Sequence, residues 1–403
     1  MNIQQLIKDL CPKGLEWHAL GEVGYFFGGV TGKSKKDFEN GNSKFITYMN
    51  VFSNPKLNID VKETVFINEG EKQNTLQYGD VLFTTSSETV EESGMSSVLV
   101  TETNEKLYLN SFCFGFRFNN LENINPNFYS YIFRSEDLRK QIVKCANGVT
   151  RFNISKERFA KITIPIPPIS IQNRIVEILD HFTDLISNLN TELDLRRKQL
   201  EHYREKMLAF GEGIEWKTLG EVCVMQRGNN VQKSDFTENG VGCIHYGQIY
   251  THYGLSATTT NKYVPKEVAA KAPKAHKNDV VITITSENVE DLCKPVAWLG
   301  NEDVAVSSHA LILKHQQDAK FMAFLLISDN VRKQKATYAH SGKVTEIIPE
   351  HVGRIKIPLP PINVQQNIVA TLDKFTTLID NIEQEITLRK KQYDYYREQL
   401  LTF

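Results

Sequence analysis

The sequence predicts an α+β protein in which two globular domains are joined by two long helices that pack as an antiparallel coiled coil. Three observations lead to this architecture. The chain has 403 residues, which is too long for one ordinary core and suits two domains of conventional size. Residues 162–210 align without a gap with residues 355–403, and about half of the paired residues are identical. Each of these segments carries a heptad pattern of apolar residues.

The duplication sets the expected domain boundaries. Residues 1–161 and 214–354 form the two globular domains, and residues 162–213 and 355–403 form the two helical spacers. Because each helix follows its own domain, the simplest packing of the two helices is antiparallel. This arrangement predicts a pseudo-two-fold axis between the halves of the molecule.

Both globular domains are predicted to mix strands and helices. Runs of β-branched and aromatic residues indicate strands at 44–48, 81–84, 112–118, 280–285 and 310–313. Helical stretches are expected at 127–146 and 318–337. A short helix from Asn2 to Leu10 aligns with the end of the first long helix, so we expect it beside the end of the second.

The repeat continues into the globular domains only at isolated anchors. Residues 16–17 and 20–23 are identical to residues 215–216 and 219–222. Between such anchors the two domains differ greatly. The chain therefore alternates variable and fixed regions, and one scaffold carries two different surfaces.

Each fixed segment opens on a proline-rich stretch, which stops a preceding helix and favours extended backbone. The following helix is predicted to begin near Ser170 or Asn363, both suitable N-caps. About 40 residues at 1.5 Å each would make it roughly 60 Å long. Apolar residues spaced four and three apart indicate a coiled-coil seam. The seam positions are Leu179, Phe182, Ile186, Leu189, Leu193 and Arg196 in the first helix, and Leu372, Phe375, Ile379, Ile382, Ile386 and Arg389 in the second.

The two seam arginines allow two interpretations. Arg196 and Arg389 each have a glutamate four residues earlier, Glu192 and Glu385, which is a favourable orientation for an ion pair within one helix. In the first interpretation the arginines extend to solvent at the edge of the seam. In the second they fix the register of the two helices.

Polar, glycine-containing loops recur at equivalent places in the two domains with different side chains. Lys and Arg neutralise phosphates, whereas Arg, Asn and Gln can pair with base edges. A single loop of this kind is usually a solvated turn, but the recurrence favours a DNA-binding surface. The candidates in the first domain are Lys33, Lys35, Lys36, Asn50, Asn54, Ser86, Ser87, Glu88, Thr150 and Arg151. The candidates in the second are Arg227, Asn229, Asn230, Gln232, Lys233, His245, Tyr246, Gln248, His252, Ser286, Glu287, Asn288 and Lys343.

Composition limits the class of protein. With 47 basic and 48 acidic residues the net charge is −1, so a DNA-binding protein would have to gather its positive charge on one face. No run of 18 apolar residues exists, and the N-terminus lacks the apolar core of a signal peptide. We therefore expect a cytoplasmic protein. Six scattered cysteines without a CxxC pair predict reduced thiols, and neither a zinc site nor disulfides.

The motifs of the common nucleotide-dependent and metal-dependent enzymes are missing. The sequence has no GxxxxGK[ST] loop, no [DN]PP[YFW] tetrapeptide and no HExxH pair. His245 and His252 are more plausible as DNA-facing or solvent-facing groups than as metal ligands. We therefore expect no catalytic residue, no bound metal and no cofactor on this chain.

The fixed segments resemble those of the specificity (S) subunits of type I restriction–modification systems, the HsdS family. The resemblance lies in Gly148–Phe152, in residues 162–180 with their second copy at 355–373, and in the strands at 79–83 and 278–282. It covers the entire chain. One departure is Asn278, which stands where the family usually has glycine.

The resemblance implies two target-recognition domains, each reading one half of a split site in double-stranded DNA. It also implies two modification (M) subunits as partners, which carry S-adenosylmethionine and methylate adenine. Restriction (R) subunits that use ATP and magnesium would join through the complex, and no membrane is involved. The chain itself would recognise DNA without catalysis.

Two alternatives remain open from the residues alone. One is a self-contained enzyme, such as a methyltransferase or a nuclease. The other is a coiled-coil scaffold unrelated to DNA.

Overall fold

The computed structural model describes residues 14–229, 231–342 and 344–403. The helix expected at residues 2–10 and the candidate contacts Asn230 and Lys343 lie outside the described residues. The chain divides into two compact units. Of the described residues, unit 1 contains those up to Leu189 together with Glu385–Phe403, and unit 2 contains those from Asn190 to Gln384.

Unit 1 is built on a four-stranded antiparallel sheet in the order β2-β9-β5-β7, with a smaller sheet, β4-β3-β8, beside it. The elements of this unit, in chain order, are β1 (Trp17–Ala19), α2 (Leu20–Val23), β2 (Gly24–Gly28), the 3-10 helix η1 (Lys35–Phe38), β3 (Ser43–Ile46), α3 (Tyr48–Ser53), β4 (Thr64–Val65), β5 (Val81–Thr84), β6 (Ser86–Ser87), β7 (Ser96–Val98), β8 (Leu107–Leu109), β9 (Cys113–Phe118), α4 (Pro126–Ile132), α5 (Glu136–Val143), β10 (Ala146–Asn147), β11 (Phe152–Ile154), α6 (Lys156–Phe159), β12 (Thr163–Pro165) and the long helix α7 (Ile169–Leu208).

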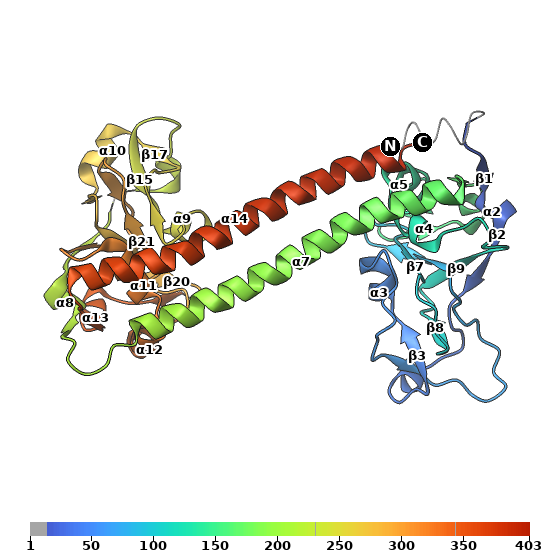
Figure 1. The fold of residues 1–403 in the computed structure, drawn as a ribbon, viewed down its shortest axis with the longest axis horizontal. Coiled ribbons are helices and arrows are strands. Elements are labelled where there is room, and N and C mark those ends of the chain that lie inside the picture. Colours follow the sequence, from blue (N-terminus) through green and yellow to red (C-terminus); the bar gives the residue numbers. More distant parts are fainter. Residues whose placement is uncertain (1–13, 230, 343) are drawn as a thin grey trace. The chain divides into compact units, whose positions relative to one another are not determined.

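Alternation along the strands places apolar side chains on both faces of the main sheet of unit 1. Val81 and Phe83 on β5 belong to a core shared with α4, α5 and the start of α7. These helices cover that face of the sheet (Figure 1). Leu82 points to the other face and packs in a separate core with α3 and β8. The unit therefore has two apolar layers, one on each side of the sheet.

Unit 2 repeats this plan with the main sheet β14-β23-β19-β21-β16 and the smaller sheet β17-β15-β22-β18. Its elements are β13 (Trp216–Thr218), α8 (Leu219–Val222), β14 (Val224–Arg227), η2 (Lys233–Asp235), β15 (Val241–Ile244), α9 (Tyr246–Thr251), β16 (Ser256–Ala257), β17 (Tyr263–Val264), α10 (Lys266–Lys271), β18 (Lys274–Ala275), β19 (Val280–Thr283), β20 (Thr285–Ser286), β21 (Pro295–Trp298), β22 (Val304–Val306), β23 (Ala310–Lys314), α11 (Ala319–Leu326), α12 (Asp329–Tyr338), β24 (His340–Ser341), β25 (Thr345–Glu346), α13 (Pro349–Gly353), β26 (Lys356–Pro358) and α14 (Ile362–Leu401).

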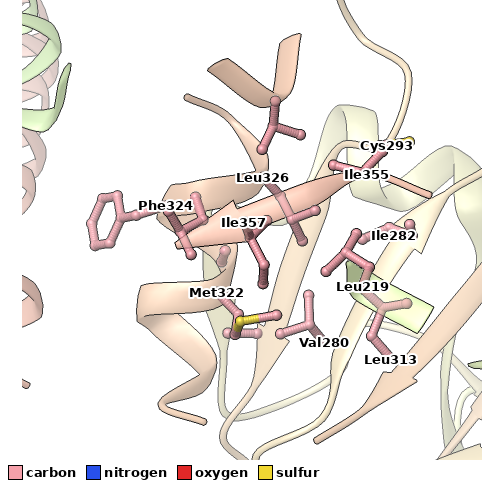
Figure 2. Close-up of a cluster of buried hydrophobic side chains, with 14 of the residues drawn as sticks. Leu219, Val280, Ile282, Cys293, Leu313, Met322, Phe324, Leu326, Ile355 and Ile357 are labelled. Carbon is pink, nitrogen blue, oxygen red and sulfur yellow. The ribbon is translucent and has the colours of Figure 1, made fainter. Parts of the chain in front are cut away.

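The core of unit 2 shows the same packing of helix on sheet. Figure 2 shows Val280, Ile282 and Leu313 of the sheet facing the helical layer, which includes Met322 of α11. Val280 pairs with Leu313 across the sheet, as Val81 pairs with Phe116 in unit 1. The matched register means that the two units place equivalent loops at the same ends of their strands.

The predicted helical stretches at 127–146 and 318–337 are each two helices, which corrects the sequence expectation. In unit 1 the Ser135 hydroxyl accepts a hydrogen bond from the Leu138 amide and starts α5 as a new helix. In unit 2 the Ser328 hydroxyl does the same for the Val331 amide at the start of α12. A capping serine inside an apolar stretch therefore ends one helix and begins the next.

The long helices begin within one residue of the expected positions, but the expected N-caps are wrong. Helices α7 and α14 begin at Ile169 and Ile362, so Ser170 and Asn363 lie inside the first turn and are not N-caps. In α7 the Pro168 carbonyl accepts from the amides of Ile171 and Gln172. The proline at this position sets the backbone for the helix, and the following polar side chain faces solvent.

A buried glutamine ties each long helix to its globular domain. In unit 1 the Gln172 amide donates to the carbonyls of Pro167 (2.7 Å) and Asn123 (2.8 Å). Its oxygen accepts from the Asn125 amide at 2.8 Å. In unit 2 Gln365 is buried in the same way, donates to Pro360 and accepts from the Asp318 amide. These glutamines stand at matching places of the fixed repeat and join helix and domain in both units.

An aspartate further along each helix gives a second attachment. Asp180 accepts from Lys56 at 2.7 Å and from the hydroxyl of Tyr131. Its counterpart Asp373 pairs with Lys320 of α11 at 2.6 Å. Both aspartates bind a lysine of the adjoining globular domain, although the two lysines come from unrelated places in the sequence.

The two long helices pack together along the predicted seam. Helix α7 leaves unit 1 and enters unit 2, whereas α14 leaves unit 2 and enters unit 1, so the helices run in opposite directions. In unit 1 the ring of Phe182 stacks on Tyr396, and in unit 2 Phe375 stacks on Tyr203. The other seam residues are buried or half-buried.

The seam arginines form the predicted ion pairs within their own helices. Arg196 contacts Glu192 at 3.2 Å, and Arg389 contacts Glu385 at 2.7 Å. Both arginine side chains are more than a third exposed, which agrees with extension to solvent at the seam edge. Their role in fixing the helix register stays a prediction.

Candidate nucleic-acid interface

In each unit several loops meet at the same end of the main sheet, around a short segment that we call the tip loop. The tip loop is residues 110–112 in unit 1, between β8 and β9, and residues 307–309 in unit 2, between β22 and β23. In unit 1 it is held by three hydrogen bonds from backbone amide to carbonyl: Val30 to Leu109, Asn110 to Ile46, and Thr85 to Phe112.

Unit 2 holds its tip loop with the equivalent three bonds. The amide of Asn229 donates to Val306 at 3.0 Å, that of Ser307 to Ile244 at 3.1 Å, and that of Ile284 to His309 at 3.0 Å. The same backbone frame therefore carries the sequence Asn-Ser-Phe in one unit and Ser-Ser-His in the other.

A glycine in each unit makes the close approach of the first loop to the tip loop possible. A Cβ atom at Gly29 would lie 2.1 Å from the carbonyl oxygen of Asn110. A Cβ atom at Gly228 would lie 2.2 Å from the carbonyl oxygen of Ser307. No side chain fits at either place, so these glycines fix the backbone on which the variable side chains stand.

In unit 1 the tip loop borders an open hollow of about 510 Å³, lined by apolar and polar groups that include Thr31, Lys33 and Asn110. The ring of Phe112 also lines the hollow and is 57% exposed. The guanidinium of Arg151, from the turn between β10 and β11, lies 6.0 Å from the centre of that ring. This part of unit 1 thus presents an apolar ring with a cation beside it.

Lys33 is already paired within unit 1. Its ammonium lies 2.6 Å from Glu71, and the side chain is only 5% exposed. Hydrogen bonds from Lys33 and then from Gln73 lower the pKa of Glu71 to about 2. Gln73 also bonds both backbone groups of Thr31. Lys33 therefore shapes the loop, and a phosphate would have to compete with a carboxylate for its charge.

Lys35 and Lys36 differ from Lys33 because they are exposed on η1. This 3-10 helix is capped by Asp37, which accepts from the amide and the hydroxyl of Ser34. Those bonds lower the pKa of Asp37 below its usual value. The two lysines, with Arg151 and the exposed Thr150, are predicted contacts of unit 1 that face solvent.

In unit 2 aromatic rings occupy the corresponding place. The ring of Tyr246 lies 4.9 Å from that of His309 and 4.6 Å from that of His245. The exposed Arg227 donates from its Nε to the Ser308 carbonyl at 3.2 Å. Unit 2 therefore also has a ring and a cation at its tip loop, but the cation comes from β14 and the ring is an imidazole.

His245 is buried beneath this cluster. Its Nδ1 accepts a hydrogen bond from the Gly247 amide at 3.2 Å. Burial lowers the pKa of His245 below its usual value, and the positive charges of Lys233 and His309 lower it further. We infer a neutral ring that supports the start of α9. Lys233, Gln232 and Asn229, predicted contacts in the segment after β14, are exposed.

Several predicted contacts are engaged inside the protein. Asn50 and Asn54 bond each other at the end of α3, and Asn50 also donates to the Asn58 carbonyl. Gln248 accepts from the His245 amide and donates to Asn261. Because these side chains hold local structure, a role in DNA contact would require their bonds to be exchanged.

The predicted serine contacts lie in two short buried strands, β6 in unit 1 and β20 in unit 2. The Ser87 hydroxyl bonds the Thr89 carbonyl and lies 2.8 Å from the Ser93 hydroxyl. Ser86 and Ser286 are buried as well. Four other predicted contacts are exposed: Glu88 after β6, Glu287 and Asn288 after β20, and His252 after α9.

The sequence does not single out four residues that the structure places at the tip loops or in hydrogen bonds to carbonyl groups. It assigned Phe112 to a strand and His309 to no element, although both lie at the tip loop. It also passed over Arg139, which donates to the carbonyls of Gly94, Glu91 and Ser93. Lys335 donates to the carbonyls of Glu290 and Leu292 in the equivalent segment of unit 2. In the sequence, only the alignment of the two halves gives a signal for these positions.

Some properties of the described residues bear on metals, thiols and membranes. Within the described ranges no group of three or more His, Cys, Asp or Glu side chains is placed to hold a metal ion. The five described cysteines are buried and free, and burial raises the pKa of Cys113, Cys223 and Cys293 to about 12. No helix of the described part is long and apolar enough to cross a membrane.

Both halves of the chain are similar to one family of known proteins. A family model described as the type I restriction modification DNA specificity domain matches residues 12–195 and again residues 211–388. The chain is 34% identical over 269 residues to the EcoR124I/EcoR124II specificity subunit of Escherichia coli, a match that covers 62% of this chain and 65% of that protein. It is 25% identical over 273 residues to the MjaVIII specificity subunit of Methanocaldococcus jannaschii, covering 62% and 64%. The chain thus spans slightly less than two thirds of these relatives.

Solved structures share the fold across nearly the whole chain. A type I restriction–modification assembly structure has a chain that matches with a TM-score of 0.62 at 19% identity, covering 97% of each chain. The S subunit from M. genitalium matches with a TM-score of 0.53 at 14% identity, covering 96% of this chain and 97% of that one.

Proposed function

Because the chain belongs to the family of type I restriction–modification DNA specificity domains, we propose that it reads a bipartite sequence in double-stranded DNA, one half with each unit. The observation that carries this proposal is the pair of tip loops. Two units with the same backbone frame present different rings at the same place, each with an arginine that comes from a different element. A frame kept constant under changed side chains is suited to reading two different half-sites.

The helical spacers have a different role in this proposal. They set the distance between the half-sites and dock two modification subunits. Their support is the fixed repeat, whose Gln172 and Asp180 and the matching Gln365 and Asp373 attach both domains to the helices in the same way. S-adenosylmethionine would be held by the modification subunits, and ATP and magnesium by restriction subunits. This chain would contribute recognition without catalysis.

The test is to purify the chain with its modification subunits and to select bound duplexes from a randomised DNA library. We expect one bipartite sequence, with binding that weakens steeply as salt rises because phosphate contacts release counterions. A complex that shows no preference among duplexes would overturn the proposal and favour a scaffold.

An enzymatic role is tested separately. The isolated chain is incubated with DNA and labelled S-adenosylmethionine, and we expect no transfer until modification subunits are added. Methyl transfer by the isolated chain would contradict the assignment of recognition alone.

The spacer role has its own test. Inserting seven residues in the middle of α7 and seven at the facing position of α14 lengthens both helices by about 10 Å. We expect a longer spacer, or loss of assembly, with both half-sites unchanged. A change in the half-sites themselves would contradict the role of the helices in spacing.

A further inference from the structure

The backbone under the ring of each tip loop is fixed by hydrogen bonds, although the ring itself is exposed. Phe112 donates its amide to the Asn110 side chain at 2.7 Å, and its carbonyl accepts from Thr85 at 2.8 Å. A single exposed apolar side chain is ordinary on a protein surface and carries no argument alone. Here its backbone is bonded on both sides, which fixes the point and the direction in which the side chain leaves the tip loop.

The equivalent residue of unit 2 supplies the second observation. His309 occupies the same place, and its carbonyl accepts from Ile284 as that of Phe112 accepts from Thr85. The neighbouring serine is identical in the two units, Ser111 and Ser308. The same backbone frame therefore carries a phenylalanine in unit 1 and a histidine in unit 2 at the same position.

A cation accompanies each ring, but it reaches that place from a different element. Arg151 comes from the turn before β11, whereas Arg227 is the last residue of β14. The residue of unit 2 that aligns with Arg151 is Val344, and the residue of unit 1 that aligns with Arg227 is Gly28. Each unit thus has an arginine at the tip loop, obtained independently of the repeat.

These groups have complementary chemistry toward DNA. An arginine beside an exposed ring is positioned to neutralise a phosphate while the ring meets the bases. A phenyl ring has no hydrogen-bonding group, so it can favour only apolar contacts, such as a thymine methyl, or a step that opens easily. An imidazole can also donate to or accept from a base edge.

We infer that the tip-loop ring is the specificity-determining side chain of each unit, Phe112 for one half-site and His309 for the other. The inference rests on the proposed function, and it names which side chain reads bases. Phe112 reads by apolar contact and stacking, and His309 reads by hydrogen bonding. Arg151 and Arg227 hold the backbone of the DNA and do not discriminate between bases.

The experiment exchanges the rings in the full chain bound to its modification subunits. Phe112→His and His309→Phe are each used to select duplexes from a randomised library, and the selected sequences are compared with those of the unchanged complex. We expect Phe112→His to alter the preference at one or two neighbouring base pairs of one half-site by about tenfold to a hundredfold. His309→Phe should alter only the other half-site.

A matched control keeps the test specific. Tyr78 is a 37% exposed ring beside the start of β5, at the opposite end of the strand from Thr84 and the tip loop. Tyr78→His should leave both half-sites unchanged. Thermal unfolding of each variant, measured beside the selection, establishes that the exposed substitutions leave the fold intact.

The arginines give a second readout. Arg151→Gln should weaken binding to all sequences alike and reduce the slope of affinity against salt by about one. A complex that selects a bipartite sequence yet keeps both half-sites after Phe112→His and His309→Phe would overturn this inference and leave the proposed function standing. A complex that selects no sequence before any substitution would overturn the proposed function itself.

Discussion

Units 1 and 2 hold the same backbone segment in place with different cationic residues. In both, the segment after β6 or β20 must be held by a cation that binds carbonyl groups. Unit 1 uses Arg139 on α5, whereas unit 2 uses the buried Lys335 on α12. The arginine that aligns with Arg139 is Arg332, which instead pairs with Asp329. The lesson is that the backbone path is shared by the units and the side chains that enforce it are not.

Backbone conformation shows the same principle. Gly79 and Gly94 have positive φ angles of 87° and 62° in unit 1. Asn278 and Cys293 take the left-handed conformation at the matching places of unit 2, with φ of 74° and 58°. Asn278 is stabilised there because its side chain bonds Gln317 and Ala319. The departure from the family glycine at this place therefore leaves the turn unchanged.

The largest expected effect comes from removing a residue that the units share. Gln365→Leu would leave a buried amide and carbonyl groups without partners, so we expect a loss of about 4 kcal/mol in the stability of unit 2. Gln172→Leu should destabilise unit 1 by a similar amount. Hydrogen exchange by mass spectrometry on the full chain assigns each loss to its unit.

The neighbouring Gln366 is exposed on the same helix and provides the control. Gln366→Leu should change the stability of unit 2 by no more than about 0.5 kcal/mol. If either buried glutamine tolerated leucine as well as Gln366 does, the view that these glutamines attach helix to domain would be wrong.

The second largest effect distinguishes the two units at one pair of aligned arginines, Arg139 and Arg332, which have different partners. Arg139→Met removes hydrogen bonds to three carbonyls, so we expect a loss of about 3 kcal/mol and faster exchange in residues 89–94. Arg332→Met breaks only an exposed ion pair and should cost about 0.5 kcal/mol or less. Equal losses for the two substitutions would contradict the comparison.

A fall in pH should lower the stability of unit 2 more than that of unit 1. Burial lowers the pKa of His245 and His315 below 6.5, so the unfolded chain binds protons at a higher pH than the folded unit. The contribution of these two histidines to the stability of unit 2 is therefore complete above pH 6.5, and it is lost as the pH falls from 6.5 through their folded pKa values. The aligned residues of unit 1 are Thr47 and Phe118, which do not titrate in this range.

Hydrogen exchange at about pH 7.5 and about pH 5.5, corrected for the intrinsic rate, measures this difference. His315→Phe, which installs the unit 1 residue, should remove part of the acid sensitivity of unit 2. Equal acid sensitivity of the two units would show that buried histidines do not distinguish them.

The smallest effect concerns the helices in unit 2. Arg197 of α7 lies 2.6 Å from Glu383 of α14, and both side chains are about half exposed. An exposed pair of this kind contributes about 0.2–1 kcal/mol, so Glu383→Gln should lower the stability of unit 2 by less than about 1 kcal/mol. A double-mutant cycle with Arg197→Gln measures the coupling, and a coupling of several kcal/mol would contradict this account of the seam.

Much of the fold could be predicted from the sequence because it depends on periodicity. The heptad pattern located both long helices and their packing, and the duplication predicted two similar units, which the family match in each half confirms. The strands predicted at 81–84 and 310–313 are confirmed as β5 and β23. The expected N-caps of the long helices and the single helix expected at 127–146 are wrong because capping depends on one side chain, which a pattern over many residues does not resolve.

The candidate site was predicted less well because its contacts join distant parts of the chain. Lys33 pairs with Glu71, and Lys56 pairs with Asp180 across 124 residues of sequence. No local pattern reveals such partners, so the sequence predicts Lys33 as a DNA contact and misses its pair with Glu71. Phe112 was read as part of a strand because its neighbours alternate like one, whereas its exposure depends on where the sheet ends.

The central claim is that each unit reads its own half-site, and exchanging a whole domain tests it most directly. Residues 214–354 are replaced by a second copy of residues 15–161, and DNA selected by the complex with its modification subunits is sequenced. The account predicts a site made of two copies of one original half-site, with the other half-site lost. An unchanged bipartite site, selected by an assembled complex, would contradict it.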